Sequence, residues 1–323
     1  MRDRTGRYID YLRISVTDRC NLRCAYCVPQ EGPETSPPYR LLSRDEILAV
    51  VKSARAMGVT HVRLTGGEPL ARQDLASIAD GIRALGVDDL SLTTNGTLLE
   101  GAAASLKEAG VDRVNVSLDS LRPEVFRKMT RNGSVDEVLA GIRAAIDAGL
   151  SPVKVNAVVM AGVNDKDVKD LARLSLGMPV SVRFIEVMPV GPYPEANARA
   201  VVPADQVKER VASLGRLSPV GDLAGAGPAQ VFRLPRALGT VGFIAPLSHP
   251  FCADCNRLRL TADGKLRPCL ASDIEVDLLP ALRGKDVQAD LATAFGQALY
   301  MKPAGHELWA RHAHSRRMCQ IGG

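Results

Sequence analysis

Short hydrophobic runs alternate with amphipathic segments along the first 187 residues of the chain. The runs are rich in Val, Ile and Leu, which is typical of strands covered on both faces of a sheet. They predict strands at Asp10–Val16, Val59–Leu64, Asp89–Thr93, Arg113–Leu118, Pro152–Val159 and Ser181–Val187. Repeated β/α units of this kind predict a parallel sheet with right-handed crossovers, either an open doubly wound sheet or an incomplete barrel.

The amphipathic segments carry signals for the start and the end of helices. A Ser followed three residues later by Glu, the spacing of a capping box, occurs at Ser43 and at Ser134. Gly58 and Gly149 stand where a helix would end in a left-handed residue. These signals predict helices between the strands.

Polar and glycine residues gather just after the predicted strands. They are Gly66, Gly67 and Glu68, then Thr93, Thr94 and Asn95, then Ser117 and Asp119, then Glu186 and Met188. Any one of them could be a turn residue or a helix cap. Together they mark the carboxyl edge of the sheet, where parallel α/β proteins build active sites.

The pattern changes after Met188. Residues 189–194 resemble a linker and residues 221–228 a flexible loop, because both are rich in Pro or Gly. Residues 230–270 predict antiparallel strands, with Asp263-Gly264 as a hairpin turn. We therefore expect two domains, residues 1–190 and residues 191–323.

Composition excludes some classes of protein. Aromatic residues make up only 4% of the chain, which argues against stacking platforms for single-stranded nucleic acid. The excess of 41 basic over 36 acidic residues is mild and suits an anionic small substrate as well as RNA. Because the sequence contains neither a signal-peptide pattern nor an apolar stretch long enough to span a membrane, we expect a cytoplasmic protein whose thiols stay reduced.

Six of the seven cysteines form two groups of three. The first group, Cys20, Cys24 and Cys27, has the spacing C-x3-C-x2-C. Three thiolates serve a cubane cluster of four irons and leave one iron open to a small molecule. A zinc site is the alternative, although zinc favours four closed ligands in paired C-x2-C units.

The second group is Cys252, Cys255 and, after thirteen intervening residues, Cys269. Zinc is a serious alternative here, but it needs a fourth ligand, and Cys319 in the basic tail is a poor candidate. Three ligands again predict a cluster with an open iron. A two-residue turn at Asp263-Gly264 would bring Cys269 back near Leu258, between Arg257 and Arg259. A slip of one residue in this register would change which of the two arginines faces the cluster.

Basic residues on the predicted strands point toward the same cavity. Arg13, Arg63 and Lys154 lie on three of the parallel strands, and the segment Arg257-Leu258-Arg259 lies beside the second cysteine group. A single such Arg is more often an ion-pair partner. Several of them at one barrel mouth predict a polyanionic ligand, because the planar guanidinium suits phosphate oxygens.

The first cysteine group, together with the Gly-Gly-Glu-Pro run at 66–69, resembles the radical S-adenosylmethionine (SAM) superfamily. The resemblance implies an incomplete (β/α)6 TIM-type barrel with a C-terminal α+β extension. It also implies that the open iron binds SAM and that one electron releases a 5′-deoxyadenosyl radical. By this resemblance Tyr26, Gly67, Ser117 and Met188 would contact SAM.

Further motifs resemble one family within it, the GTP 3′,8-cyclases of molybdenum cofactor biosynthesis. They are Thr17–Cys24, Thr65–Leu70, Leu92–Gly96, Asn115–Asp119, Arg183–Glu186, Phe251–Leu270 and the terminal Gly322-Gly323. The resemblance implies a second 4Fe-4S cluster that holds guanine. It also implies that Arg13, Arg63, Thr93, Lys154, Arg257, Leu258 and Arg259 bind GTP.

The resemblance also implies a reaction and its partners. The radical would take hydrogen from C3′ of GTP, and the carbon radical would attack C8 of guanine. An external reductant would supply electrons, and cyclic pyranopterin monophosphate synthase would use the product of this monomer or homodimer. The terminal double glycine would enter the active site, and neither nucleic acid nor membrane would be a partner.

Two other functions remain open from the sequence. One is a radical enzyme that modifies a peptide with the help of an auxiliary cluster. The other is a zinc-stabilised RNA-binding module that uses the mild basic excess. The β/α repeats, the glycine turn and the scarcity of aromatic residues count against the second.

Overall fold

A computed structural model describes residues 1–28, 40–190, 193–221, 227–308 and 316–322. Its central strands pair in parallel in the order of the sequence. They are β1 (Tyr11–Ser15), β2 (His61–Thr65), β3 (Asp89–Thr94), β4 (Arg113–Ser117), β5 (Val153–Val159) and β6 (Val180–Glu186). Each overlaps a predicted strand, and the incomplete barrel is confirmed.

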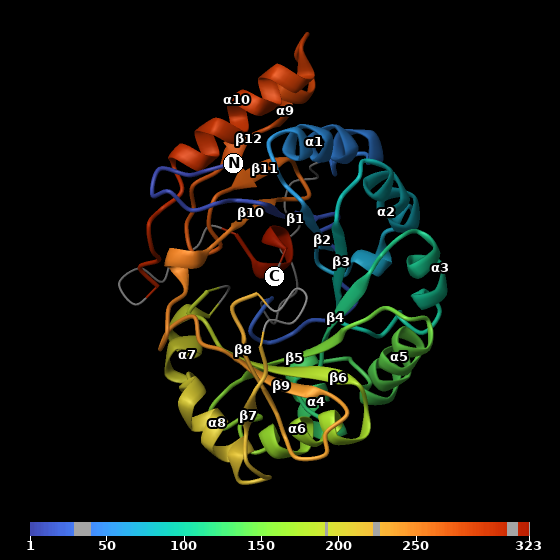
Figure 1. The fold of residues 1–323 in the computed structure, drawn as a ribbon, viewed down its shortest axis with the longest axis vertical. Coiled ribbons are helices and arrows are strands. Elements are labelled where there is room, and N and C mark those ends of the chain that lie inside the picture. Colours follow the sequence, from blue (N-terminus) through green and yellow to red (C-terminus); the bar gives the residue numbers. More distant parts are fainter. Residues whose placement is uncertain (29–39, 191–192, 222–226, 309–315, 323) are drawn as a thin grey trace.

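Helices surround this barrel as an outer ring (Figure 1). They are α1 (Arg44–Ala56), α2 (Leu75–Ala84), α3 (Ala103–Glu108), α4 (Pro123–Thr130), α5 (Val135–Asp147) and α6 (Val168–Gly177), with a short 3-10 turn η1 (Pro69–Ala71). The predicted capping box at Ser43 is confirmed, because the Glu46 N–H donates to its hydroxyl and Glu46 Oε2 accepts from its N–H. Ser134 is the N-cap of α5, but its side chain makes no cap hydrogen bond, so the second predicted box is wrong.

The core lies between the helices and the outer face of the sheet. Leu12 and Ile14 of β1 are fully buried there, as are Val62 and Leu64 of β2. Because side chains alternate along a strand, the residues between them face the barrel interior. That interior holds Arg13 and its registered neighbours rather than a second apolar layer.

The C-terminal part adds strands to both edges of the barrel. Strand β9 (Thr240–Ile244) pairs in parallel with β6, and β10 (Arg257–Leu260) pairs in parallel with β1. Beyond them β8 (Gln230–Arg233), β7 (Ser218–Pro219), β11 (Lys265–Arg267) and β12 (Val276–Asp277) pair antiparallel. The predicted antiparallel structure is therefore correct for these outer hairpins and wrong for the inner edges of β9 and β10. The two proposed halves share one sheet.

The hairpin after β10 corrects the predicted register. Arg259 pairs with Arg267, and Thr261 N–H donates to Lys265 O at 2.9 Å, so three residues form the turn instead of two. Gly264 has φ +87°, the left-handed residue that a three-residue hairpin turn needs. The extra residue moves the partner of each β11 residue by one position, and this register, continued past the end of β11, would set Cys269 opposite Arg257 instead of Leu258.

Several further helices complete the fold. They are α7 (Pro194–Arg199), α8 (Ala204–Ala212), η2 (Cys252–Asp254), α9 (Leu279–Leu282), α10 (Val287–Tyr300) and α11 (Met318–Ile321). Residues 191–192 of the predicted linker, 222–226 of the predicted loop and Gly323 lie outside the described residues. In the part of the chain that is described, no helix has both the length and the apolar character to cross a bilayer.

Candidate active site

The first cysteine group lies in the segment that follows β1. Cys27 N–H donates to Cys24 O at 2.9 Å, which turns the chain between two of the thiols. Its contact with Cys319 and burial, followed by smaller contributions from Cys24 and Cys20, raise the pKa of Cys27, so the other two thiols of the group lie within electrostatic range of it. Burial, with a smaller contribution from Glu68, raises the pKa of Cys20 to about 11. A half-buried site lined by three thiols suits an iron–sulfur cluster, which stabilises the thiolates electronically.

The glycine turn after β2 packs directly on this segment. Gly67 N–H donates to Thr17 O and Glu68 N–H donates to Arg19 O, both at 2.7 Å. A Cβ at position 67 would lie 2.3 Å from Arg19 O, which is too close for any side chain. Gly67 therefore has a structural role besides the predicted contact with SAM: it allows the turn to dock on the cysteine segment.

Glu68 joins this turn to the end of β3. Its buried carboxylate accepts hydrogen bonds from Thr94 Oγ1 and Asn95 N at 2.7 Å and from Leu70 N at 3.0 Å. Asn95 Nδ2 in turn contacts Cys20 Sγ at 3.8 Å. Burial raises the pKa of Glu68 despite these donors. The residues after two strands thus form one rigid support for Cys20.

The predicted SAM contacts lie at the ends of different strands. Tyr26 donates from its hydroxyl to Asp119 Oδ2 at 2.9 Å, and Val158 N donates to Asp119 Oδ1 at 2.8 Å. Burial raises the pKa of Asp119 to about 6. Ser117 ends β4, two residues before this carboxyl group, and Met188 packs near Val190 after β6. The structure brings these positions to the carboxyl side of the barrel that bears the first cysteine group.

The second cysteine group lies at the other end of the barrel. Cys252 and Cys255 precede β10, whose first residue pairs with Tyr11 at the start of β1. Cys269 follows β11 and interacts electrostatically with Cys252. Burial raises the pKa of Cys255, but Arg257 and Lys302 outweigh this effect and lower it to about 7. The two cysteine groups therefore stand at opposite ends of strand pair β1–β10.

Basic side chains line the barrel interior between these two ends. Arg259, Arg13 and Arg63 stand in register across β10, β1 and β2. Burial, followed by Arg183, Arg113 and Arg63, lowers the pKa of Lys154 to about 5. Arg13, Arg63 and Lys154 line the middle of the barrel. The sequence had predicted them at its mouth, and the structure corrects that position. Thr93 lies one strand further along, in register with Asn115.

Sequence reasoning missed some of the polar lining. Arg183 stands in register with Asn156, and Arg183 Nη2 and Asn156 Oδ1 are both buried with no hydrogen-bond partner among the described residues. Asn156 lies two positions after Lys154, so alternation along β5 could have identified it. By contrast the carboxylate of Glu186, a residue that the sequence singled out, accepts hydrogen bonds from the backbone N–H groups of Ala204 and Leu247.

The C-terminal helix α11 closes the barrel over the first cysteine group, and the end of the chain lies near the centre of the ring in Figure 1. Arg259 Nη1 donates to Gly322 O at 2.8 Å. The thiols of Cys319 and Cys27 are in hydrogen-bonding contact. Cys319 was predicted to lie outside both cysteine groups. The structure places it beside the first and away from the second.

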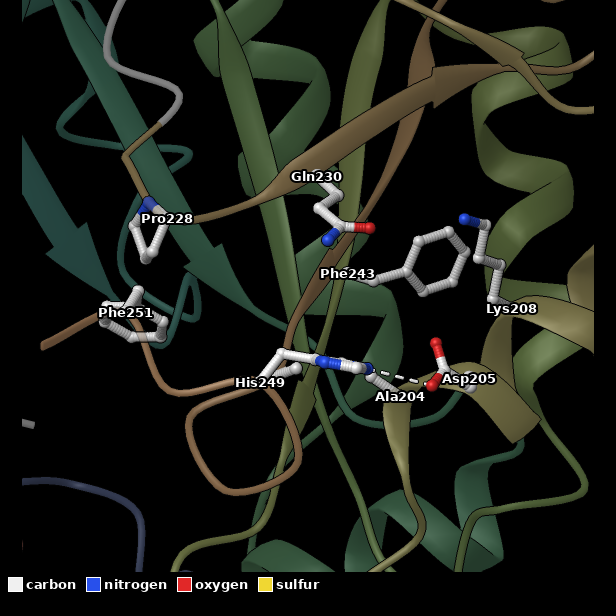
Figure 2. Close-up of a pocket in the computed structure, with 9 residues that line it drawn as sticks. Ala204, Asp205, Lys208, Pro228, Gln230, Phe243, His249 and Phe251 are labelled. Carbon is white, nitrogen blue, oxygen red and sulfur yellow. Dashed lines mark hydrogen bonds and ion pairs between the residues drawn. The ribbon is translucent and has the colours of Figure 1, made fainter. Parts of the chain in front are cut away.

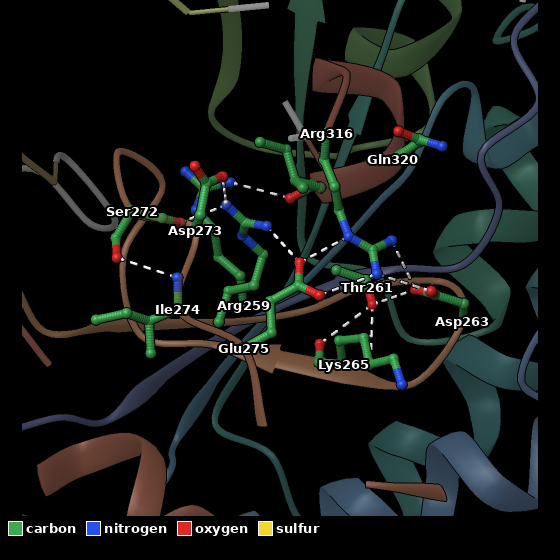
Figure 3. A network of polar contacts seen from close by, with 12 residues as sticks. Arg259, Thr261, Asp263, Lys265, Ser272, Asp273, Ile274, Glu275, Arg316 and Gln320 are labelled. Carbon is green, nitrogen blue, oxygen red and sulfur yellow. Dashed lines mark hydrogen bonds and ion pairs between the residues drawn. The ribbon is translucent and has the colours of Figure 1, made fainter. Parts of the chain in front are cut away.

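An ion-pair network holds this helix in place (Figure 3). Arg316 donates to Asp263 Oδ2 at 2.9 Å and to Glu275 Oε2 at 3.0 Å. Asp263 belongs to the hairpin turn, so the tail is attached to the same hairpin that precedes Cys269. Arg267 contacts Glu275 from the opposite side.

We expect Arg316→Ala to loosen α11. Loss of a partly buried, hydrogen-bonded charge costs on the order of 1–3 kcal/mol, so Cys319, only 9% exposed, should react with iodoacetamide about tenfold faster or more. Mass spectrometry of the C-terminal peptide measures this rate. Arg173→Ala, which removes an exposed ion pair with Asp170, is the control. Equal protection of Cys319 in both variants would show that other contacts hold the helix.

A separate hollow lies on the flank of the barrel between α8, β8, β9 and the loop after β9 (Figure 2). His249 Nε2 contacts Asp205 Oδ2 there at 2.9 Å, beside Lys208 and Phe243. None of the predicted site residues lines this hollow. The candidate active site is therefore the barrel interior, where the thiols and the buried cations are.

Comparison with known proteins relates the chain to two protein families. Residues 14–175 match the radical SAM superfamily, and residues 180–308 match the family described as Molybdenum Cofactor Synthesis C. Two curated proteins named GTP 3′,8-cyclase, from Moorella thermoacetica and Pelotomaculum thermopropionicum, are each 47% identical over the full length of both chains. A third, from Petrotoga mobilis, is 43% identical over the same extent.

Solved structures resemble the fold at low sequence identity. SuiB from Streptococcus suis, bound to S-adenosylmethionine, has a TM-score of 0.60 at 15% identity over 89% of this chain and 64% of its own. Native anSMEcpe with bound AdoMet has a TM-score of 0.56 at 15% identity, over 92% of this chain and 82% of its own. Matches to the whole chain at 47% identity are far more specific than these. The chain belongs to the radical SAM superfamily and, within it, to the GTP 3′,8-cyclase family.

Proposed function

We propose that this chain converts GTP into 3′,8-cyclo-7,8-dihydro-GTP, the first step of molybdenum cofactor biosynthesis. The observation that carries the proposal is the registered row Arg259, Arg13 and Arg63. This row lies between one cysteine group at the carboxyl end of β1 and another at the amino end of β10. A nucleotide triphosphate is an anion of the kind that such a row would hold between two metal centres.

The residues present fit the cofactors that this reaction needs. Cys20, Cys24 and Cys27 would hold a first 4Fe-4S cluster. SAM held there would supply a 5′-deoxyadenosyl radical for hydrogen abstraction from C3′ of GTP. Around it, Tyr26, Gly67, Ser117 and Met188 would contact SAM. Their positions at the ends of four different barrel segments would exclude water and orient the cofactor.

The second cysteine group would hold another 4Fe-4S cluster, with guanine nearby. Cys252, Cys255 and Cys269 supply three thiols and leave room for a ligand that is not protein. The lowered pKa of Cys255 favours the thiolate that a metal binds. A fixed guanine would present C8 to the radical formed at C3′, because both reacting atoms belong to one bound nucleotide.

The cationic lining would bind the ribose and the triphosphate. The residues proposed for this role are Arg13, Arg63, Thr93, Lys154, Arg257, Leu258 and Arg259. Burial and mutual repulsion lower the pKa of Arg259 to about 10. A bound polyanion relieves that repulsion. The electrostatic repulsion among the basic residues of the free protein therefore adds to the free energy gained on binding.

The direct test is anaerobic incubation of the reconstituted protein with GTP, SAM and dithionite, followed by mass analysis of the nucleotide. We expect a cyclised product of GTP together with 5′-deoxyadenosine, and neither when GTP is replaced by ATP. SAM cleavage that is indifferent to GTP would contradict the proposal and favour a peptide-modifying enzyme. Iron near zero after reconstitution would contradict both.

Binding of GTP should take up a proton at neutral pH. With a pKa of about 5, Lys154 is mostly neutral in the free protein at pH 7. A triphosphate favours the ammonium form, so its pKa rises on binding and about one proton is taken up per nucleotide. Calorimetry in buffers of different ionisation enthalpy measures this uptake.

Lys154→Met should weaken GTP binding and abolish most of that proton uptake. Lys107→Met, at a residue whose ammonium contacts Gly149 O on the outside of the barrel, is the matched control. Uptake that persists unchanged in Lys154→Met would assign the proton to another group.

The partners of the reaction belong to the same proposal. A one-electron reductant would be needed in the cytoplasm, and cyclic pyranopterin monophosphate synthase would consume the cyclised nucleotide. The chain would act as a monomer or homodimer, without nucleic acid or membrane.

A further inference from the structure

Lys302 is buried beside the second cysteine group, although no sequence motif singled it out. It follows α10, and only 3% of its surface is exposed. Its ammonium donates to Pro268 O at 2.6 Å and to Arg257 O at 2.8 Å, and it contacts Cys255 Sγ at 3.6 Å. An ammonium has three donor hydrogens, and these three contacts account for all of them.

The contacts of Lys302 reach both parts of the chain that supply the second cysteine group. Pro268 immediately precedes Cys269, and Arg257 lies two residues after Cys255. The Lys302 side chain therefore fixes the spacing between the start of β10 and the end of β11, at the level of the thiols. Arg7 adds to this support. It donates to the carbonyl of Pro303, the residue after Lys302, at 2.7 Å and to Cys252 O at 2.8 Å.

The two basic residues differ in how their charge is balanced. Arg7 pairs with Asp3 at 2.6 Å. Among the described residues, the ion pairs of the neighbouring hairpin join Lys265, Arg267 and Arg316 to carboxylates, and Lys302 has no carboxylate partner. A buried ammonium with only carbonyl and thiol partners is costly unless a negative charge lies nearby.

Three thiolates around a cubane cluster supply such a charge. The core of an oxidised 4Fe-4S cluster carries about two positive charges against three thiolates, so the site is anionic, and reduction by one electron makes it more so. We propose that Lys302 is a positioning residue of the second cysteine site, and that its ammonium is the buried counter-charge of an anionic iron–sulfur cluster held there. This inference rests on the proposed function of that site.

The role makes two separable contributions. As a positioning residue, Lys302 holds Cys255 and the carbonyl before Cys269 at a fixed separation, which favours assembly of the cluster. As a counter-charge, it stabilises the reduced, more negative cluster, which raises the reduction potential. A merely structural lysine would affect loading alone and would leave the potential of the loaded cluster unchanged.

The test uses the full chain with the first group replaced, Cys20→Ala/Cys24→Ala/Cys27→Ala, so that only the second cluster contributes iron. Lys302→Met, Lys302→Arg and Lys302→Gln are compared with Lys265→Met, a lysine of the same hairpin whose partner is Asp277 at the surface. Iron and sulfide per chain, their loss to a chelator, and the midpoint potential from an electron paramagnetic resonance titration are measured.

We expect Lys302→Met to lose iron to the chelator several-fold faster and to lower the potential by about 59 mV, a tenfold change for a one-electron couple. Lys302→Arg should lose iron faster but keep the potential, because it retains the charge and not the geometry. Lys265→Met should match the parent in both. Should Lys302→Met fail to fold, the potential of Lys302→Arg and that of Lys302→Gln decide the matter.

The outcomes separate the inference from the function on which it rests. A parent variant that binds no iron would overturn the second cluster itself. Iron in the parent, with the same loading and potential in Lys302→Met, would overturn the role of Lys302 and leave the cluster standing. A potential that falls equally in Lys302→Arg and in the neutral variants would reject the counter-charge.

Discussion

Cys269→Ala is expected to abolish formation of the cyclised nucleotide, by about 100-fold or more, while the first site keeps its iron. Cys269 is one of only three thiols of the second group, and loss of one ligand would release the guanine end of GTP. Misplacement of a reacting atom by about 1 Å can cost a factor of 100. Iron per chain should fall by about half, since one of the two proposed cubanes would be lost. Product analysis and iron determination on the same sample measure both effects.

The reciprocal variant is the control for this prediction. Cys20→Ala/Cys24→Ala/Cys27→Ala should also lose about half of the iron, but it should cleave no SAM at all. Cys269→Ala should keep the iron of the first site and its ability to bind SAM. Undiminished cyclisation in Cys269→Ala would remove the second site from the reaction. Zinc in place of iron in the reciprocal variant would give that site a structural role.

Gly67→Ala is expected to have a comparable effect through the first site. The added Cβ would lie 2.3 Å from Arg19 O and 2.7 Å from Asp18 O, and both are backbone atoms that cannot rotate away. Overpacking of this kind costs about 1–3 kcal/mol, and the cysteine segment must move to relieve it. We expect SAM cleavage to fall by about 100-fold and the first cluster to be lost more readily to a chelator.

Gly101→Ala provides the matched control for that change. A Cβ at position 101 would meet nothing within 4 Å, and the residue lies outside the barrel mouth, in the turn before α3. It should retain the activity and the iron content of the parent. Normal SAM cleavage by Gly67→Ala would mean that the two backbone segments separate without consequence for the site.

The strands of the barrel could be predicted because their signal is local. Runs rich in β-branched residues, such as Val153–Val159, need cover on both faces, and parallel β/α units provide it. The capping box at Ser43 was equally readable, since both of its hydrogen bonds lie within four residues. Ser134 has the same local pattern without the bonds, so the spacing alone does not fix the orientation of the capping side chain.

The hairpin at Asp263 shows where local reasoning failed. A turn of two or three residues fits the same Asp-Gly pair, and the choice shifts every later residue by one position. The sequence left both options open, and packing of Gly264 against Leu279 accompanies the longer turn. The position of Cys269 opposite Arg257 depends on that choice.

The support around the candidate site was also beyond sequence reasoning. Lys302 and Arg7 are ordinary basic residues in the sequence, separated by nearly the whole chain, yet they support neighbouring cysteines of one group. Cys319 looked isolated for the same reason. Such contacts join distant segments, and no periodicity or spacing within either segment reports them.

By itself the amino-acid sequence determined the parallel β/α repeats and the two cysteine groups, and it placed Arg13, Arg63 and Lys154 on neighbouring strands, because spacing and alternation act within a few residues. The tertiary structure alone decided that the two groups stand at opposite ends of β1 and β10, with the cations in register between them. It also decided that Lys302 lies buried against Cys255 and that α11 closes the barrel. Pairing of strands that are far apart in the sequence sets these distances. Burial then sets the desolvation free energy of each charged group.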